Sequence, residues 1–557
     1  MDIPKIFNIT ESAHRIHNPF TPEKLATLVA ALSLVFALAG CSGNSNGKYA
    51  TFDKFVDETM KKYDVPGAVV VIATADTTEF IKAYGVRSIA DQKPMDNKTR
   101  FQLASVSKFF AAASIGLVVE SGKVTWTDPV KNYYPAFQLK SARLTDACSL
   151  KTLLSHQSGL LAYDGEILGR QGWTYPEIIT RVRYMAVNEG DLSKAPPEPP
   201  AAYSNMGFFL AGEFAAYMDA DVKALDWVKL VDTKLLAPLG MTRSTADDSV
   251  LFKVPPVDEN FVAGHWKKTG TLEVMELEQD TLPPAGSIIS TGEDMVRWMR
   301  MLLGHGQLEG KTILKGETVD AMFADVKETA ANGSPTGGKT WYGLGTETYE
   351  FKTREKTWHI VSKNGALNGV RTNLVLIPDK KIGIFVIANK NLNQFPEAIC
   401  YRFLVDQLGD GVDKDGKVID LQAKAWADEA VWSAMEQGWP MKPNPKPATI
   451  PGDQKVGTYR SDLYGTFKIT EKTDGSGSFA MTGVDKPYSA TLLHYDGEKY
   501  LFDWGNPDDM QGAAQFIQTA GVVTSLEGQA LPPLVNYGTF KKKEGSGLGA
   551  PVKTGEK

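Results

Sequence analysis

Ser105-Val106-Ser107-Lys108 runs directly into an apolar stretch, residues 109–120, and this segment does most to decide the fold. Its pattern predicts a helix that begins near Ser105. Residues three apart share one face of a helix, so Lys108 would lie one turn from Ser105. A serine hydroxyl is too weakly acidic to attack a carbonyl carbon without a base within hydrogen-bonding reach. The segment therefore predicts a nucleophilic serine with a lysine beside it.

The expected position of Ser105 at a helix N-terminus adds an electrostatic feature. The first N–H groups of a helix have no acceptor inside the helix, and the positive end of the helix dipole lies there. The backbone N–H of Ser105 is therefore predicted to form one half of an oxyanion hole.

Two further motifs follow in the order that this chemistry needs. Tyr203-Ser204-Asn205 is the first, and Lys363-Asn364-Gly365 is the second. The second comes after an apolar run at 357–361 and before two strand-like runs at 372–377 and 382–388. Together the motifs predict a serine nucleophile, a proton shuttle and an oxyanion site, which suit the hydrolysis of acyl bonds.

Other copies of these short patterns lie in unsuitable settings. Ser45-Asn46-Gly47-Lys48 lies in a Gly/Asn/Ser stretch with no helical pattern behind it and is interpreted as a linker. Lys268-Thr269-Gly270 is predicted to be a hairpin turn, and Lys553-Thr554-Gly555 lies in a Gly/Lys-rich tail. The copies with suitable surroundings are those at Ser105, Tyr203 and Lys363.

On these motifs the chain resembles the serine β-lactamase and penicillin-recognising superfamily, in the branch that holds class C β-lactamases, D-aminopeptidases and related esterases. The tyrosine of the middle motif points to this branch, because class A enzymes carry Ser-Asp-Asn there. The resemblance extends over residues 50–410. Further family landmarks appear at Val65-Pro66-Gly67, Trp126-Thr127-Asp128-Pro129-Val130, residues 153–160, Pro238-Leu239-Gly240-Met241 and Pro284-Ala285-Gly286.

The resemblance implies that Ser105, Lys108, Tyr203 and Lys363 are the catalytic residues. Ser105 would form the acyl-enzyme, and the two lysines would flank the hydroxyl group of Tyr203. An unperturbed tyrosine has a pKa near 10, and a base that acts near neutrality needs a value about 3 lower, or about 4 kcal/mol. Two ammonium groups at ~4 Å could each supply up to about 4 kcal/mol at an effective dielectric of about 20. Either Tyr203 or a neutral Lys108 would serve as the base.

The resemblance assigns Asn205, Asn364, Gly365 and Ala366 to substrate binding. Asn205 would hydrogen-bond the amide side chain of the substrate, and the N–H of Ala366 would complete the oxyanion hole. The family usually has threonine or a small residue in the middle of the third motif, where this chain has Asn364. The larger amide changes what meets a substrate carboxylate, so a dedicated β-lactamase ranks below a peptidase, amidase or esterase.

The composition is that of a globular chain long enough for more than one domain. The 557 residues carry a mild net charge of −6 without a basic patch, which argues against a nucleic-acid partner. The seven histidines are scattered, so neither a metal nor an organic cofactor is expected, and His156 is predicted to support a turn. Cys148 and Cys400 are interpreted as buried free thiols, with a disulfide as the alternative.

The N-terminus predicts export. Residues 25–40 form an almost wholly apolar run that is short for a membrane span, which needs about 20 residues. The run ends in Leu38-Ala39-Gly40-Cys41, which resembles a bacterial lipoprotein signal and would make Cys41 the lipidated membrane anchor. An uncleaved N-terminal anchor is the alternative. Either interpretation predicts an exported, membrane-anchored protein, in the periplasm or at the cell surface.

The predicted fold class is α/β, with a mixed antiparallel sheet flanked by helices and an all-helical subdomain. An amphipathic helix at 52–63 and a strand pair at 67–74 and 79–85 precede the Ser105 segment. Helices are predicted at 292–303 and 396–408 on either side of the strands that carry the third motif. Strands from both ends of the region therefore surround a helical insertion, and the site is expected in the cleft between them.

A small all-β domain is predicted after a proline-rich linker at 439–452. Eight short strand-like runs within 453–541 predict a meander or small barrel, which resembles the lipocalin-like domain appended to some serine hydrolases of this superfamily. A packing, lid or oligomerisation module is favoured over a ligand cup, which leaves a homo-oligomer open. The remaining predicted divisions are a signal segment at 1–41, a tether at 42–50, the hydrolase domain at 51–438 and a disordered tail at 542–557.

Two functions follow from these observations. The first is an exported serine hydrolase that forms an acyl-enzyme at Ser105 on amide or ester bonds, in D-amino-acid peptides, esters or β-lactams. The second is a surface lipoprotein that binds, or is acylated by, cell-wall-like ligands without useful turnover. The intact set of Ser105, Lys108, Tyr203 and Lys363 favours the first, because a binding protein has no physical need to keep these residues together.

Overall fold

The computed structural model describes most of the chain from residue 47 onward. The described residues are 47–191, 193, 198–252, 260–268, 270–329, 333–437, 449–471, 477–482, 489–496, 499–503, 513–520, 522–529 and 539–543. Cys41, with the predicted signal segment, and residues 439–448 of the predicted linker lie outside them. Within the described part, no helix is both long and apolar enough to cross a bilayer.

An eight-stranded antiparallel sheet organises residues 50–437, here called the α/β part. The strand order is β2-β1-β14-β13-β12-β11-β10-β9. β1 (Gly67–Thr74) pairs with both β2 (Thr78–Gly85) and β14 (Ile382–Ala388), so the two ends of this region meet in one sheet, as predicted. β1 and β14 are rich in Val and Ile and almost fully buried, which is typical of central strands covered on both faces. The remaining strands of the sheet are β9 (Lys327–Thr329), β10 (Thr340–Tyr342), β11 (Glu347–Lys352), β12 (Thr357–Leu367) and β13 (Val370–Ile377).

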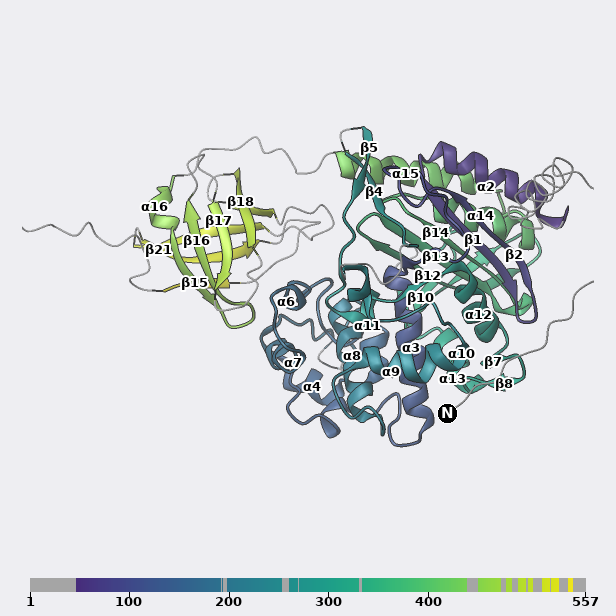
Figure 1. Ribbon diagram of the computed structural model, residues 1–557. Coiled ribbons are helices and arrows are strands. Elements are labelled where there is room, and N and C mark those ends of the chain that lie inside the picture. Colours follow the sequence, from purple (N-terminus) through teal and green to yellow (C-terminus); the bar gives the residue numbers. More distant parts are fainter. Residues whose placement is uncertain are drawn as a thin grey trace, which may run out of the picture. The chain divides into compact units, whose positions relative to one another are not determined.

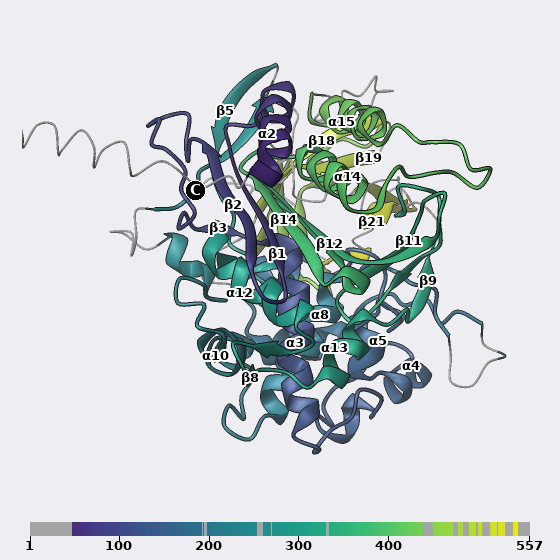
Figure 2. The ribbon, with the colours of Figure 1, turned by 90° about the vertical axis from the view of Figure 1, so that its right-hand side faces the viewer.

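Helices cover both faces of this sheet (Figures 1 and 2). α2 (Ala50–Lys62), α14 (Phe395–Leu408) and α15 (Leu421–Gln437) lie on one face. α12 (Gly292–Leu303) and α3 (Ser107–Glu120) lie on the other. The other strands of this region form three two-stranded sheets: β3 (Phe101–Gln102) with β6 (Ile289–Ser290), β4 (Gly264–Lys268) with β5 (Thr271–Met275), and β7 (Gln307–Leu308) with β8 (Lys311–Thr312).

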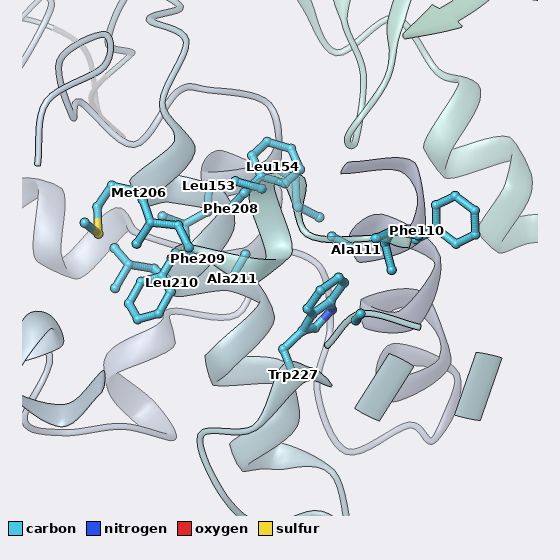
Figure 3. Packing of buried hydrophobic residues seen from close by; sticks show 14 of the residues in the cluster. Phe110, Ala111, Leu153, Leu154, Met206, Phe208, Phe209, Leu210, Ala211 and Trp227 are labelled. Carbon is cyan, nitrogen blue, oxygen red and sulfur yellow. The ribbon is translucent and has the colours of Figure 1, made fainter. Parts of the chain in front are cut away.

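α3 is the central helix of the helical subdomain, and it is buried on almost its whole circumference. A helix that is apolar all round belongs in a core, and α3 packs against α8 (Asn205–Met218), which is equally apolar. Figure 3 shows this packing, with Ala111 of α3 near Trp227 of α9 and with α8 side chains beside those of α5. The other helices before residue 437 are α4 (Ala142–Ala147), α5 (Leu150–Leu154), α6 (Ile167–Arg170), α7 (Tyr175–Arg181), α9 (Trp227–Val231), α10 (Ala237–Leu239), α11 (Pro283–Gly286) and α13 (Gly316–Phe323). The short helix α16 (Gly452–Lys455) directly precedes the C-terminal strands.

The C-terminal strands form a closed antiparallel barrel, which confirms the predicted all-β domain. Each strand pairs with its neighbours in sequence, and β15 also pairs with β22 to close the barrel. Phe467 stacks on Phe479 with ring centroids 4.2 Å apart, and Phe540 meets both rings. These three buried rings fill space with one another, which favours a structural role for the barrel over a role as a ligand-binding cup. The similarity to lipocalin-like domains remains a resemblance in sequence pattern. The strands are β15 (Gly457–Ser461), β16 (Gly465–Glu471), β17 (Gly477–Thr482), β18 (Ser489–Asp496), β19 (Lys499–Asp503), β20 (Ala513–Thr519), β21 (Val522–Gln529) and β22 (Thr539–Lys542).

We expect Trp227 to contribute strongly to the stability of the helical core. Its side chain is fully buried, and its Nε1 donates a hydrogen bond to Ser114 Oγ at 2.9 Å. Trp227→Ala leaves a large cavity and should lower the free energy of unfolding by about 3–5 kcal/mol in urea titrations. Trp426→Ala is the matched control, because that side chain is 42% exposed, and it should cost clearly less. Equal losses in the two variants would contradict this assignment.

Candidate active site

Ser105 lies in a short 3-10 turn, η2 (Ala104–Val106), directly before α3, close to the helix N-terminus that the sequence predicts. Ala104 has a φ of 50°, in the left-handed region, and the regular helix starts at Ser107. A non-glycine residue in this region is uncommon and is often found at functional sites. Lys108 remains in the first turn of α3, and its Nζ lies 3.1 Å from Ser105 Oγ.

The amino group of Lys108 is buried and held by three oxygen atoms. Nζ donates to Asn205 Oδ1 at 2.7 Å and to the carbonyl oxygen of Ala285 at 2.8 Å, and Ser105 Oγ is its third neighbour. Both carbonyl oxygens are pure acceptors, so a neutral amine would donate its two hydrogens to them and accept from the serine hydroxyl. An ammonium group would donate to all three. The proton can therefore pass from Ser105 to Lys108 without a change in the other two hydrogen bonds.

Burial lowers the pKa of Lys108 to about 7, and the nearby charge of Lys363 acts in the same direction. The carboxylates of Asp280, Glu166 and Glu347 oppose this shift. A lysine with a pKa near neutrality is partly unprotonated at physiological pH, which a general base requires.

Tyr203 also contacts the serine, since its hydroxyl donates to Ser105 Oγ at 2.8 Å. Burial raises the pKa of Tyr203 well above its usual value, although the hydrogen bond with Ser105 acts against the rise. Of the two bases that the sequence left open, Tyr203 and a neutral Lys108, the directions of these pKa shifts favour Lys108. The two ammonium positions lie over the ring, 4.9 Å and 5.2 Å from its centroid, and burial of a phenolate costs more than they return.

His156 supports the segment that carries Tyr203, as predicted. Its Nδ1 accepts a hydrogen bond from the backbone N–H of Ser204 at 3.0 Å, and its ring lies 4.7 Å from that of Tyr203. Burial, together with the charges of Lys108 and Lys363, lowers the pKa of His156 well below its usual value. The ring is therefore neutral and can accept. Ser204 Oγ caps α8 by accepting from the N–H of Gly207 at 3.1 Å.

The third motif lies within β12, which pairs with β13 as far as Leu367. Lys363 is buried there, and its Nζ forms an ion pair with Glu347 on β11. Asn364 is half-buried, and Ala366 is exposed.

Gly365 brings β12 against the turn that holds Ser105. A Cβ atom at this position would lie 2.8 Å from the backbone nitrogen of Ser105 and 2.6 Å from the carbonyl oxygen of Leu103. The side chain of Thr372 on β13 fixes the same place by donating to Leu103 O at 2.8 Å. Only glycine allows the strand to lie this close, so the N–H groups of the turn and of the strand share one region.

Asn205 begins α8 and connects two groups. Its Oδ1 accepts from Lys108, and its Nδ2 donates to Glu166 Oε1 at 2.8 Å. Partial burial raises the pKa of Glu166 to about 7, and burial raises the pKa of Asp280 to about 6.

The structure brings together Ser105, Lys108, Tyr203, Asn205, Lys363 and Gly365, and it adds three residues that the motifs did not predict. Ala285 was part of a recognised landmark, but a backbone carbonyl has no residue-type signature. Glu347 pairs with Lys363 across neighbouring strands, and a correct register for β11 and β12 could have found it. Glu166 lies in a loop and no periodic pattern marks it.

The two cysteines among the described residues have no contact with this cluster in the hydrogen bonds and ring contacts of the site. Cys148 and Cys400 are buried free thiols, as predicted, and burial raises the pKa of both. Within the described ranges, no three His, Cys, Asp or Glu side chains form a group that could hold a metal ion.

The chain is similar in sequence and in fold to several known proteins. A family model described as Beta-lactamase matches residues 52–408. The chain is 24% identical over 459 residues to the "Unguisins hydrolase ungD" of Aspergillus violaceofuscus, which spans 76% of this chain and 77% of that protein. It is 22% identical over 357 residues to "Protein flp" of Staphylococcus aureus (strain N315), across 64% of this chain and 66% of that protein.

Two solved structures share the fold. The octameric penicillin-binding protein homologue from Pyrococcus abyssi aligns with a TM-score of 0.54 and 18% identity, over 88% of this chain and 99% of its own. A class C beta-lactamase aligns with a TM-score of 0.53 and 20% identity, over 66% of this chain and 99% of its own.

The reactivity of Ser105 should depend on pH through Lys108. Deprotonation activates the base, so the rate of labelling by an uncharged serine-reactive phosphonate should rise with pH, with a midpoint near 7. Below the midpoint the rate should fall about tenfold per pH unit. Glu166 has a pKa in the same range, so Glu166→Gln is the control: it should retain the rise, displaced to lower pH because a nearby negative charge is lost. A rate that is flat from pH 5 to pH 8 would rule out Lys108 as the base.

Proposed function

This chain belongs to the Beta-lactamase family of hydrolases, and from that premise we propose that it is a serine hydrolase that works through an acyl-enzyme at Ser105. One observation carries the proposal: Ser105 Oγ lies within hydrogen-bonding distance of both Lys108 Nζ, at 3.1 Å, and Tyr203 Oη, at 2.8 Å. A nucleophile with a base on one side and a hydroxyl donor on the other has what acyl transfer requires.

In acylation, Lys108 is the base. As Ser105 Oγ forms its bond to the substrate carbonyl carbon, the hydroxyl proton moves to Lys108 Nζ. The resulting ammonium keeps its bonds to Asn205 and Ala285. Tyr203 stays protonated, since burial raises its pKa, and its hydroxyl lies next to the reacting oxygen. Tyr203 therefore passes a proton to the departing amine or alcohol and is re-protonated from Lys108, so both groups return to their starting states.

The negative charge that develops on the carbonyl oxygen is placed against backbone N–H groups. The N–H of Ser105 and the N–H of Ala366 form the oxyanion hole in this proposal, and the close approach at Gly365 supports it. In deacylation, water attacks the acyl-enzyme and gives its proton to neutral Lys108. As the ester bond to Ser105 Oγ breaks, the protonated Lys108 returns that proton to Ser105 Oγ, and the acid product leaves with Ser105 and Lys108 in their starting states.

The proposed substrates are amides and esters, with D-amino-acid peptides and simple esters ahead of β-lactams. Asn364 and Gly365 would line the substrate side of β12. The half-buried Asn364 carboxamide stands where the family usually has threonine or a small residue, which disfavours a dedicated β-lactamase. One relative is named a hydrolase of unguisins, and two solved neighbours are a penicillin-binding protein homologue and a beta-lactamase, so the acyl substrates of this fold vary widely.

Replacement of the nucleophile tests the proposal. Ser105→Ala should lower hydrolysis of a panel of p-nitrophenyl esters, D-alanine p-nitroanilide and a chromogenic cephalosporin by at least about 10³-fold, because the covalent step is lost. Ser155→Ala is the control: that buried hydroxyl binds the backbone of α5 and should affect stability more than turnover. Hydrolysis that survives in Ser105→Ala would refute the proposal. If neither form turns over any substrate but both bind cell-wall-like ligands, the surface-lipoprotein alternative would replace it.

Export and anchoring form a separate proposal, supported by the sequence around Cys41 alone. In a bacterial host, the protein should incorporate labelled palmitate and sediment with membranes, and Cys41→Ala should abolish the incorporation. Retention of the label in the variant would contradict lipidation at this residue. A homo-oligomer is also proposed, on the precedent of the octameric neighbour, and the mass measured by light scattering would decide it.

A further inference from the structure

Glu166 is a carboxyl group beside the proposed site that the mechanism above does not use. It lies at the end of the loop that leads into α6, and it accepts a hydrogen bond from Asn205 Nδ2 at 2.8 Å. The other end of the Asn205 side chain accepts from Lys108, which contacts Ser105. Two side chains therefore separate the carboxyl group from the nucleophile.

The loop that carries Glu166 is tied to the middle motif. The N–H of Tyr163 donates to the carbonyl oxygen of Tyr203 at 3.0 Å. Tyr163 has a φ of 56° and Gly165 a φ of 80°, so two left-handed bends occur within four residues. Bends of this kind cost energy at a non-glycine residue and persist where the surrounding structure fixes them. They place both Tyr163 and Glu166 next to the catalytic cluster.

Glu166 has an acceptor atom that the protein does not occupy. Asn205 already uses its oxygen for Lys108 and its amide for Glu166 Oε1. In the part of the chain that the structure describes, no group donates to Glu166 Oε2, and the residue is only half-buried. An N–H donor of a substrate that enters beside Asn205 therefore finds its acceptor on Glu166.

The surroundings of this acceptor suit a positive charge. The Tyr163 ring is 37% exposed, and its centroid lies 5.4 Å from that of Tyr203. Aromatic faces attract cations, and a carboxylate makes its strongest hydrogen bonds with charged donors. The buried ammonium group of Lys363, on β12, already forms an ion pair with Glu347. Arg170, the other cation that acts on Glu166, forms an ion pair with Glu278. An ammonium group on the substrate would therefore give Glu166 a charged donor of its own when Lys108 is neutral.

We infer that Glu166 is a specificity-determining residue that binds an ammonium group on the acyl portion of the substrate. The inference rests on the proposed function and narrows it: the preferred substrates are amides or esters of amino acids whose amino group is free. Substrates in which that nitrogen is acetylated carry no positive charge there, so they would bind less well beside Glu166. Tyr163 contributes its ring face to the same ammonium group.

Matched substrates test the inference directly. D-alanine p-nitroanilide and N-acetyl-D-alanine p-nitroanilide differ at one nitrogen, which is an ammonium group in the first and a neutral acetamide in the second, and kcat and KM are measured for both. A parallel pair of probes, diphenyl 1-aminoethylphosphonate and its N-acetyl form, reports labelling of Ser105 by intact mass and needs no turnover. The wild-type protein should favour the free amine of each pair.

Glu166→Gln removes the charge and keeps an oxygen that can accept from Asn205. This variant should lower kcat/KM for the free amine by about 10- to 100-fold, mainly through KM, and leave the acetylated substrate within about twofold. The labelling rates of the two probes should change in the same ratio. Glu189→Gln, which removes a half-buried carboxylate from the same connection between α5 and α8, should leave both ratios unchanged.

The outcomes separate the inference from the proposed function. Equal loss on both members of each pair in Glu166→Gln would overturn ammonium binding and leave a positioning role for the residue. A wild-type preference for the acetylated member would also overturn it. Labelling or turnover that persists in Ser105→Ala would refute the proposed function itself, and the inference would fail with it.

Discussion

The burial of the Lys108 amino group is the constraint on which the rest of this site depends. A buried ammonium is costly unless it is paired, and the free energy is lower when the group gives up its proton. Two carbonyl oxygens and a serine hydroxyl satisfy the hydrogen-bonding capacity of the amine in either protonation state. Burial therefore turns an ordinary lysine into a base that can act near neutrality. The same burial has the opposite effect on Tyr203, which it keeps protonated.

Four separate segments have to meet to create this environment. α3 supplies Lys108, α8 supplies Asn205, α11 supplies the Ala285 carbonyl, and β12 closes the site with Lys363. Close backbone approaches make this possible. Gly212 of α8 faces Pro284 of α11, and an ideal Cβ atom there would lie 2.5 Å from the proline ring. Gly365 has the corresponding role between β12 and the Ser105 turn. The apolar packing of α3 and α8 thus serves the chemistry by fixing where these segments cross.

The sequence was sufficient for the parts that depend on periodicity and on residue type. The first two strands, the helices at 292–303 and 395–408, and the eight barrel strands all appear close to their predicted positions. Ser105, Lys108, Tyr203 and Lys363 could be found because each belongs to a motif of distinctive residues.

The structural features that could not be predicted from the sequence depend on tertiary contacts. Ala104 has a left-handed φ of 50°, which no sequence pattern marks, and the regular helix begins at Ser107, two residues after Ser105. The sequence left Tyr203 and Lys108 open as the base, because the cost of burial, which raises the pKa of Tyr203, depends on the packing around the ring. Glu166 contacts Asn205 because of the conformation of the loop before α6. The conformation of such a loop cannot be predicted from hydrophobic periodicity, because a loop has none.

The central claim is that Ser105 becomes covalently acylated, and rapid acid quenching followed by peptide mapping tests it most directly. A p-nitrophenyl ester of a D-amino acid would be mixed with the full chain, quenched within milliseconds to seconds and digested. The account predicts an acyl group on the peptide that contains Ser105, formed at the rate of the nitrophenol burst and lost at the steady-state rate. An acyl group on another residue, or turnover with no covalent species at any time, would contradict it.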